Sequence, residues 1–427
     1  MRAALWSVAI QAVGSAATVA AALLVTSTMG LAAQGQFGLL RSWNDALVTI
    51  AVLGLPQGLL HLQYRESVPV AALRPWVLRH VLLLALLALL ALLCAALALA
   101  LLRLLPAGAV ALSPGTVLVL AAAVPLAAAV PLAAAHLLWR SLALRDAGTV
   151  VYAAITAAPA LLVVVALVPV CLLGSTSGLA WALLVAAALS AALSGWVVRR
   201  ANHRPASGEA AQPWSRATLW SVGVETGVQG VLIALSPALV LSTVGWIGAS
   251  LAEVGVISLG LHVYQIFGVA AAYVAPMVYN RAASALRPPT AADIGAALRA
   301  RSTPLRLMLG AAAAVLALLV VRWLWPAGAD ALAMLSLMAL AGLISMAVRL
   351  LLTLMLACGV FRPLTWQALA RLLLVTGGAA LLMRYVPATL AVPLSLAATE
   401  AVMLVWLLRM LRAGDPREVA ASGPATP

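Results

Sequence analysis

The stretch Leu5-Trp6-Ser7-Val8-Ala9-Ile10-Gln11 returns later in the chain as Leu219-Trp220-Ser221-Val222-Gly223-Val224-Glu225. Each copy is followed by a long apolar run and then by a short segment of small residues. That segment is 27–30 after the first copy and 242–245 after the second, where the sequence predicts a loop. Similarity at so long a period within an apolar chain predicts a protein built from two homologous halves.

The composition places these halves in a membrane. Of the 427 residues 65% are hydrophobic and only 8% are charged, whereas soluble domains carry roughly 25% charged residues. The net charge is +14 and every basic residue is arginine. In a soluble chain this charge would suggest nucleic acid, but here the arginines fall mostly in short loops, where they orient the chain in the membrane. No nucleic-acid partner is therefore predicted. The three cysteines have no paired spacing, so neither a disulfide framework nor a zinc site is predicted. No cofactor and no other metal are expected.

Apolar runs of about 20 residues, the length that crosses a bilayer, predict an all-α integral membrane protein. Twelve transmembrane helices are expected, in two pseudo-symmetric six-helix bundles. The predicted spans are 5–28, 40–63, 77–103, 111–138, 149–173 and 177–198, then 217–243, 252–278, 304–325, 331–357, 364–385 and 389–411. The corresponding domains are an N-terminal lobe (1–198), a cytoplasmic linker (199–216), a C-terminal lobe (217–411) and a disordered cytoplasmic tail (412–427).

The distribution of arginine predicts the orientation in the membrane. With the amino terminus inside the cell, most arginines, including Arg140 and Arg371, lie on the cytoplasmic side. Those left at outer ends are Arg41, Arg103, Arg322 and Arg384. Because arginine accumulates on the inner side, we expect a multi-pass protein of the inner (plasma) membrane with both termini cytoplasmic.

Two local patterns add detail to this organisation. Gly54 and Gly58 form a Gly-x-x-x-Gly pair that permits a close helix contact. In the connection 280–303, Thr290 stands three residues before Asp293, which resembles a capping box and predicts a short interfacial helix.

Polar side chains inside the spans are the candidates for function, because polar groups at mid-membrane must face a cavity, a partner or a substrate. Candidates for substrate binding are Arg349, Arg41, His262, Gln11, Gln229, Asn44 and Gln265. Candidates for ion coupling are Asp45, Glu225 and Glu253. Arg349 is the least easily explained otherwise, since a guanidinium at depth costs about 2.5–3.5 kcal/mol on insertion scales and seldom faces lipid.

Several of these residues also have a plainer structural interpretation. Arg41 and Asp45 are one helical turn apart and could form an ion pair at a helix end. Glu225 could reach cytoplasmic water, and His262 could be a buried imidazole with satisfied hydrogen bonds. Histidines predicted to be interfacial, at cytoplasmic ends, are His61, His80 and His136.

No motif of an enzyme occurs in the chain. There is no nucleophile elbow, no His-Glu-x-x-His and no Walker loop. The sequence therefore predicts a protein that is not an enzyme, and without an ATP-binding module transport would be driven by gradients or by the membrane potential.

The chain is predicted to have two six-helix halves, and the second helix of each half opens with a short motif, Gln36-Phe37-Gly38 in the first and Glu253-Val254-Gly255 in the second. This organisation resembles the multidrug/oligosaccharidyl-lipid/polysaccharide (MOP) flippase superfamily. Within it the chain is most similar to the bacterial polysaccharide-biosynthesis branch, the O-antigen type flippases. The resemblance covers residues 1 to about 411. It implies a V-shaped pair of bundles whose first, second, seventh and eighth helices line a central cavity. In flippases of lipid-linked oligosaccharides that cavity is cationic and holds the diphosphate, whereas the candidates here include both basic and acidic residues.

The resemblance implies a flippase that moves an undecaprenyl-diphosphate-linked oligosaccharide from the cytoplasmic to the periplasmic leaflet for lipopolysaccharide O-antigen or other surface polysaccharide. Its partners would be the lipid-linked glycan, the bilayer, and a glycan polymerase or ligase of the same pathway. The alternative is a cation-coupled multidrug exporter of the same fold, which the acidic candidates would suit. A third interpretation is a non-transporting scaffold, or a glycan polymerase or ligase itself, but those enzymes would carry a large periplasmic loop.

Overall fold

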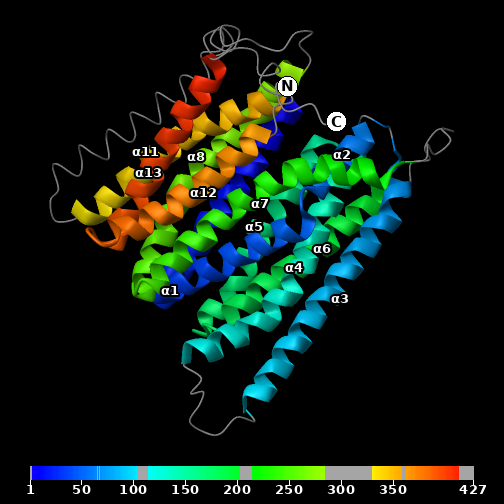
Figure 1. The fold of residues 1–427 in the computed structure, drawn as a ribbon. Helices are drawn as coiled ribbons and strands as arrows, with labels where there is room; N and C mark the ends of the chain where they lie inside the picture. The colour runs from blue at the N-terminus through cyan, green and yellow to red at the C-terminus, as the bar shows by residue number, and fades with distance from the viewer. Residues whose placement is uncertain are drawn as a thin grey trace. The chain divides into compact units, whose positions relative to one another are not determined.

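The computed structural model of the 427-residue chain describes residues 2–64, 66, 68–103, 114–201, 214–283, 329–357 and 362–412. All regular structure in these residues is α-helical, which confirms the predicted all-α class. The first helices are α1 (Arg2–Val52), α2 (Leu55–Tyr64), α3 (Val70–Arg103), α4 (Pro114–Ala147), α5 (Thr149–Leu172) and α6 (Gly178–Ala201). They are followed by α7 (Arg216–Trp246), α8 (Leu251–Ala283), α11 (Ala329–Ala357), α12 (Arg362–Leu382) and α13 (Ala388–Arg412) (Figure 1).

Ten helical segments of the described residues are long and apolar enough to cross a membrane. The first of them, Ala9–Val52, has 44 residues and is bent at Gly30. It contains most of the predicted span 5–28 and the first part of the predicted span 40–63, which continues in α2. The predicted span 304–325 lies outside the described residues, as do the Thr290 capping motif and most of the tail. Every other predicted span has its helix in the structure.

The helix breaks differ from the predicted loops. Residues 27–29 are helical, and only Gly30 leaves the helix, with φ 84° and ψ 175°, a conformation that is essentially restricted to glycine. The hydroxyl of Thr28 donates to the carbonyl oxygen of Leu24 at 2.7 Å, so the side chain satisfies its polarity within the helix. The second predicted loop, 242–245, is also helical, and α7 ends only at Trp246. The prediction of a multi-residue loop at both places was therefore wrong.

The predicted close contact at Gly54 and Gly58 is confirmed. The second span is interrupted at Leu53 and Gly54, both with positive φ, and α7 crosses this break. A Cβ at Gly58 would lie 2.5 Å from the carbonyl oxygen of Leu219, and one at Gly54 would overlap the backbone of Gly223. Only glycine permits this approach, so the repeated stretch at 219–225 packs against the break in the first unit.

The chain divides into two compact units, Met1–Ala238 and Leu239–Pro427. In the first unit α4 packs along α6 and α1 along α5. In the second unit α8 packs on α11, and both α11 and α12 pack on α13. The division falls inside α7, and most of the predicted linker 199–216 lies outside the described residues, so the predicted lobe boundaries stay a prediction.

The exposed leucines of α3 indicate that the helix is surrounded by lipid. α3 packs mainly along α4, and its leucines on the other sides are exposed, with Leu82 67% and Leu86 62% accessible. Soluble proteins rarely expose so long a continuous apolar surface, whereas in a bilayer these leucines contact acyl chains. Together with the ten apolar helical segments, this surface indicates a multi-pass membrane protein.

Candidate functional site

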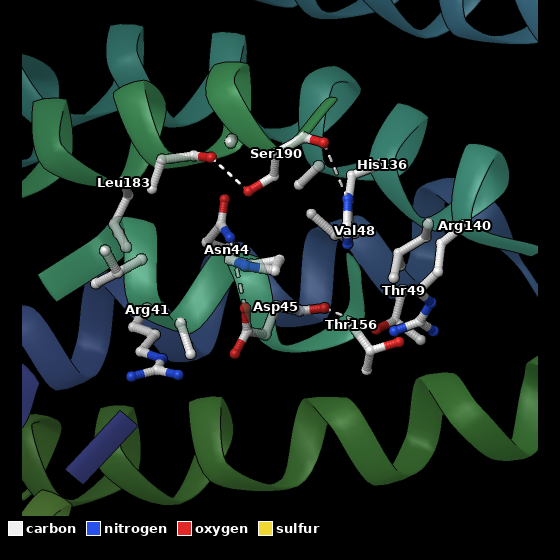
Figure 2. A pocket seen from close by; sticks show the side chains of 17 residues that line it. Arg41, Asn44, Asp45, Val48, Thr49, His136, Arg140, Thr156, Leu183 and Ser190 are labelled. Atoms are coloured by element: carbon white, nitrogen blue, oxygen red, sulfur yellow. Dashed lines mark hydrogen bonds between the residues drawn. The ribbon is translucent and has the colours of Figure 1, made fainter. Parts of the chain in front are cut away.

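A cavity of about 290 Å³ lies inside the first unit. Its polar lining comes from α1 (Arg41, Asn44, Asp45, Thr49), α4 (His136, Arg140), α5 (Thr156) and α6 (Ser190) (Figure 2). The structure thus brings together three of the residues predicted from the sequence, on one face of the second half of α1. It adds side chains from three other helices that the sequence analysis did not connect with them.

The α1 side chains do not pair as the simplest interpretation of their spacing suggested. The guanidinium of Arg41 donates from Nη2 to the hydroxyl of Thr18 at 3.3 Å, on the part of α1 before the bend. The amide of Asn44 donates weakly to Asp45 Oδ1 at 3.5 Å. Arg41 and Asp45 form no ion pair, so that interpretation was wrong, because the arginine turns toward the earlier part of α1.

Three hydroxyl groups of the lining donate their protons to backbone carbonyl oxygens of their own helices. Thr49 donates to the carbonyl oxygen of Asp45 at 2.7 Å, Thr156 to that of Tyr152 at 2.8 Å, and Ser190 to that of Ala186 at 2.6 Å. A hydroxyl has a single proton. These three groups therefore present only oxygen lone pairs toward the cavity.

His136, predicted at a cytoplasmic helix end, is buried inside the first unit, and Arg140 on the next turn of α4 is half-buried. His136 is 4% exposed, and its Nδ1 is 3.2 Å from the carbonyl oxygen of Ser190 on α6. The guanidinium of Arg140 lies 5.7 Å from the centre of the Tyr152 ring, a cation–π contact. α4 continues to Ala147, past the predicted end of the span at 138, so His136 lies within the helix and not at its end. Its depth in the membrane stays a prediction.

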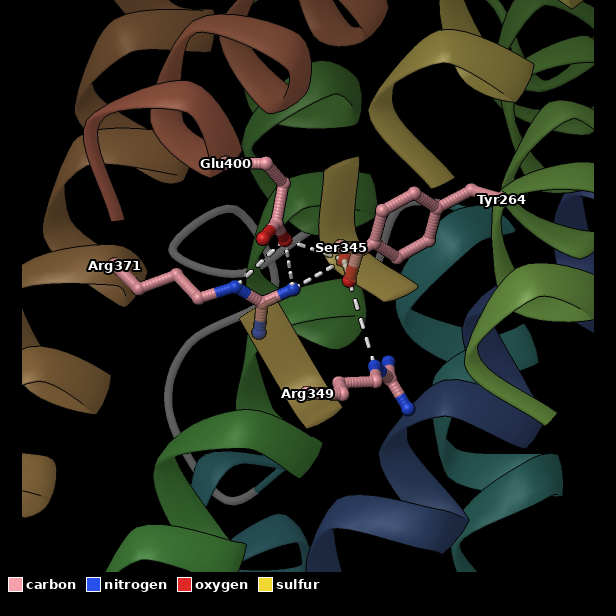
Figure 3. Close-up of polar contacts among 5 residues, drawn as sticks. All are labelled: Tyr264, Ser345, Arg349, Arg371 and Glu400. Atoms are coloured by element: carbon pink, nitrogen blue, oxygen red, sulfur yellow. Dashed lines mark hydrogen bonds and ion pairs between the residues drawn. The ribbon is translucent and has the colours of Figure 1, made fainter. Parts of the chain in front are cut away.

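The second unit contains a buried polar cluster that joins four of its helices (Figure 3). Arg371 of α12 donates to Glu400 Oε1 of α13 through Nε at 2.8 Å and through Nη2 at 2.5 Å. Tyr264 of α8 donates to the same oxygen at 2.6 Å and accepts a bond from Arg371. Ser345 of α11 lies 2.9 Å from the Tyr264 hydroxyl, and Arg349 Nε donates to Ser345 at 3.4 Å.

The direction of the hydrogen bonds in this cluster follows from proton counting. The only hydroxyl proton of Tyr264 goes to Glu400, so the Ser345 hydroxyl must donate to Tyr264. Ser345 then accepts from Arg349. The sole salt bridge among the described residues is Arg371–Glu400, so the carboxylate neutralises Arg371 directly and Arg349 only through two hydroxyl groups.

Arg349, the strongest candidate from the sequence, is half-buried at the edge of this cluster. The described residues provide it with no carboxylate within salt-bridge distance. Its guanidinium lies against the backbone of α8 at Gly268, where a Cβ would be 2.6 Å from Arg349 Cζ. The absent side chain at Gly268 therefore makes the space that Arg349 occupies.

The other predicted residues are dispersed. His262 of α8 is half-buried, with Nδ1 2.7 Å from the carbonyl oxygen of Ser258, which fits the satisfied imidazole of the plainer interpretation. Gln265 is exposed and Gln229 is buried, while Gln11 is half-buried. None of these four residues lines the cavity of the first unit.

Of the two remaining acidic candidates, Glu253 caps the start of a helix, and the side chain of Glu225 is not among those the structure describes. The Glu253 carboxylate accepts from the Ser250 backbone amide at 2.8 Å and from its hydroxyl at 3.0 Å. The Ser250 hydroxyl in turn is 3.3 Å from the Glu253 amide, which completes a capping box at the start of α8. Glu225 is helical in α7, but its side chain lies outside the described atoms.

The residues missed from the sequence are chiefly Arg140, Arg371, Tyr264 and Glu400. One signal could have found Glu400, because it is the only acidic residue in the last apolar run and a carboxylate there requires a partner. Which arginine supplies that partner depends on packing between α12 and α13. In the described part of the chain no three His, Cys, Asp or Glu side chains gather as a metal site would require.

Comparison with solved structures identifies the fold. Over 96% of this chain and 98% of the other, the structure is similar to the inward-facing conformation of a multidrug resistance MATE family transporter of the MOP superfamily, with a TM-score of 0.64 and 13% identity. A MATE transporter in the straight conformation matches with a TM-score of 0.62 and 15% identity, over 96% of this chain and 95% of the other. A MATE transporter in the bent conformation matches with a TM-score of 0.58 and 13% identity, over 99% and 96% of the two chains. No protein-family model and no curated protein matches the sequence. At these identities the likeness shows the fold alone.

Proposed function

We propose that this chain, which shares the fold of MATE transporters, is a membrane transporter that flips a lipid-linked, undecaprenyl-diphosphate-bearing oligosaccharide from the cytoplasmic to the periplasmic leaflet by alternating access. The proposal includes an inner-membrane location with both termini cytoplasmic. It also includes a glycan polymerase or ligase as the consumer of the product, and assigns no enzymatic activity to the chain.

The observation that carries the proposal is Arg349, a half-buried guanidinium that no described carboxylate neutralises. In the second unit Arg371 neutralises Glu400 and leaves Arg349 without a salt bridge to any described residue. Uncompensated positive charge inside an apolar bundle is costly. An anionic substrate such as a diphosphate would offset that cost, whereas a cationic drug would increase it.

The membrane potential is sufficient to drive such a substrate outward. Moving one charge across 100 mV is worth about 2.3 kcal/mol, so a doubly charged anion leaving a negative interior gains roughly twice that. No coupling ion is required on this estimate. This fits the second unit, where the Glu400 charge is already neutralised by Arg371.

The second candidate function is a cation-coupled multidrug exporter. The observation that favours it is the likeness to a solved structure described as a multidrug resistance MATE family transporter. Among the acidic residues that would suit coupling, Asp45 faces the cavity of the first unit, while Glu253 serves as a helix cap. Of the two candidates whose side chains the structure describes, Asp45 is therefore the one on which this alternative depends, and Glu225 stays a prediction.

A reconstituted transport assay separates the two functions. Purified protein in proteoliposomes would be supplied with a fluorescent undecaprenyl-diphosphate glycan, and appearance in the opposite leaflet would be measured with and without an imposed potential. We expect Arg349→Ala to reduce the rate at least about tenfold, the loss of roughly one charge-assisted hydrogen bond.

The matched control for this assay is Arg384→Ala, which removes an exposed arginine from the same unit. Normal glycan transport by Arg349→Ala would remove Arg349 from the mechanism. Absence of glycan transport in the wild type, together with efflux of a cationic dye that Asp45→Asn abolishes, would replace the flippase by the drug exporter.

A further inference from the structure

One end of the cavity in the first unit has polar atoms that the proposed function does not use. At this end His136 and Arg140 lie beside Thr49 and Thr156, while Arg41 lies at the other end (Figure 2). His136 Nε2 and Arg140 Nε are both buried, and neither atom has a hydrogen-bond partner among the described residues. A buried polar atom without a partner costs about 1–3 kcal/mol, so a pair of them in one cavity marks a position where water or a polar ligand binds.

The role of His136 Nε2 follows from its other nitrogen. Nδ1 faces the carbonyl oxygen of Ser190, and a carbonyl oxygen only accepts, so Nδ1 carries the ring proton. In the neutral imidazole Nε2 is then a bare acceptor. Protonating this nitrogen would place a second positive charge beside Arg140, which comes from the same helix. The ligand at this position must therefore donate a hydrogen bond to Nε2.

Arg140 requires the opposite partner. Its guanidinium is held over the Tyr152 ring at 5.7 Å, and its Nε–H is buried without an acceptor. Among the described side chains, α5 contributes only the uncharged Thr156 and α6 only the uncharged Ser190 to the polar lining beside His136. The charges facing the rest of the cavity are Arg41 and Asp45 of α1. A ligand beside Arg140 must therefore accept a hydrogen bond, and negative charge on it is favoured.

The neighbouring hydroxyls cannot replace such a ligand. The protons of Thr49, Thr156 and Ser190 are all donated to carbonyl oxygens of their own helices. They offer lone pairs to a ligand that carries hydroxyl protons, but no proton to His136. The complementary group thus combines an anionic oxygen with an acidic hydroxyl.

We propose that this end of the cavity binds a phosphate group that still carries a proton, as inorganic hydrogen phosphate or a small phosphate monoester does. Its hydroxyl donates to His136 Nε2, and its anionic oxygen accepts from Arg140 Nε. At about 290 Å³ the cavity is at the lower limit for ligand sites, which suits a small anion with water and excludes a lipid-linked glycan. A diphosphate diester has no proton to donate at neutral pH, so this site differs from that of the proposed substrate.

Sulfate provides the discriminating probe, because it resembles phosphate in size and charge but has no hydroxyl proton at neutral pH. Full-length protein in nanodiscs would be equilibrated with radiolabelled inorganic phosphate at constant ionic strength, and unlabelled phosphate or sulfate would compete. We expect sulfate to compete at least about tenfold more weakly, since it leaves the buried His136 Nε2 unpaired. This comparison uses the unmodified protein and does not depend on the folding of any variant.

Two substitutions then assign the contacts. Arg140→Gln is expected to weaken phosphate binding at least about tenfold, and His136→Phe to make phosphate and sulfate compete almost equally. Arg349→Ala is the control, because it is expected to lose glycan transport while phosphate binding is retained. Equal competition by the two anions in the wild type, no phosphate binding, or unchanged binding by Arg140→Gln would each overturn the proposal.

Discussion

Removal of the Glu400 carboxylate alone is expected to destabilise the second unit strongly. Glu400 is fully buried, and its Oε1 accepts hydrogen bonds from both Arg371 and Tyr264. In Glu400→Ala the guanidinium of Arg371, a residue only 9% exposed, would lose its counter-charge inside an apolar bundle. Breaking a buried pair by removing one partner costs about 3–5 kcal/mol. Since 1 kcal/mol corresponds to roughly 2–4 °C in a unit of this size, the expected fall in Tm is roughly 6–20 °C.

The matched variant removes both partners. Arg371→Met combined with Glu400→Leu replaces the pair by apolar groups of similar size, and such replacements are often neutral or stabilising. Its Tm is therefore expected within a few degrees of the wild type, in contrast to either single variant. Thermal unfolding of the purified protein in detergent, followed by tryptophan fluorescence, measures the double-mutant cycle of wild type, Arg371→Met, Glu400→Leu and the double variant, with Glu400→Ala beside it.

The outcome distinguishes two roles of the cluster. A large loss in each single variant with recovery in the double variant means that the charges interact mainly with each other. If Glu400→Ala keeps the wild-type Tm, the carboxylate does not neutralise Arg371 as the geometry indicates. If the double variant is as unstable as the singles, the stabilising contacts are those with Tyr264, and the ion pair is not what holds these helices together.

Three further predictions follow from local geometry. Gly268→Ala would place a Cβ 2.6 Å from Arg349 Cζ, so it is expected to lower glycan translocation about tenfold at unchanged protein level. The control is Gly377→Ala, whose Cβ would have no atom within 4 Å and which should have little effect in the same assay. Glu253→Ala is expected to cost about 1 kcal/mol in thermal unfolding, as loss of a helix cap does, with an unchanged transport rate per folded molecule; abolished transport would instead support ion coupling. Gly30→Ala, at φ 84° and ψ 175°, is expected to cost about 1–3 kcal/mol, and an unchanged Tm would show that α1 can bend elsewhere.

The membrane-spanning helices could be predicted from the sequence because bilayer thickness sets their length. The apolar runs therefore correspond to helices throughout the described residues, and the span 304–325 stays a prediction. The breaks between helices could not be placed as well. Ser27 and Thr28 suggested a loop by composition, but their hydroxyls bond to carbonyl oxygens of the preceding turn and the helix continues to Gly30.

The site was predictable only where one helix carries it. Arg41, Asn44 and Asp45 share a face of α1 by helical periodicity, and the cavity of the first unit lies on that face. His136 and Arg140 reach the same cavity from α4, nearly a hundred residues later, and no local pattern connects them. Their positions near a predicted helix end suggested a cytoplasmic, interfacial location, whereas His136 is buried and Arg140 is half-buried in α4, which packs along α6.

Apolar length and long-range similarity are properties of the chain alone, so they were enough to identify a helical, membrane-embedded and internally repeated protein. The scarcity of polar residues in the spans also marked Arg349 as unusual. Which charges compensate one another became known only from the fold. Arg371 meets Glu400 across two helices, and Arg349 and Arg140 keep positive charge that no described carboxylate neutralises. Electrostatic compensation depends on distances of a few ångströms between side chains from different helices, and those distances are set by packing.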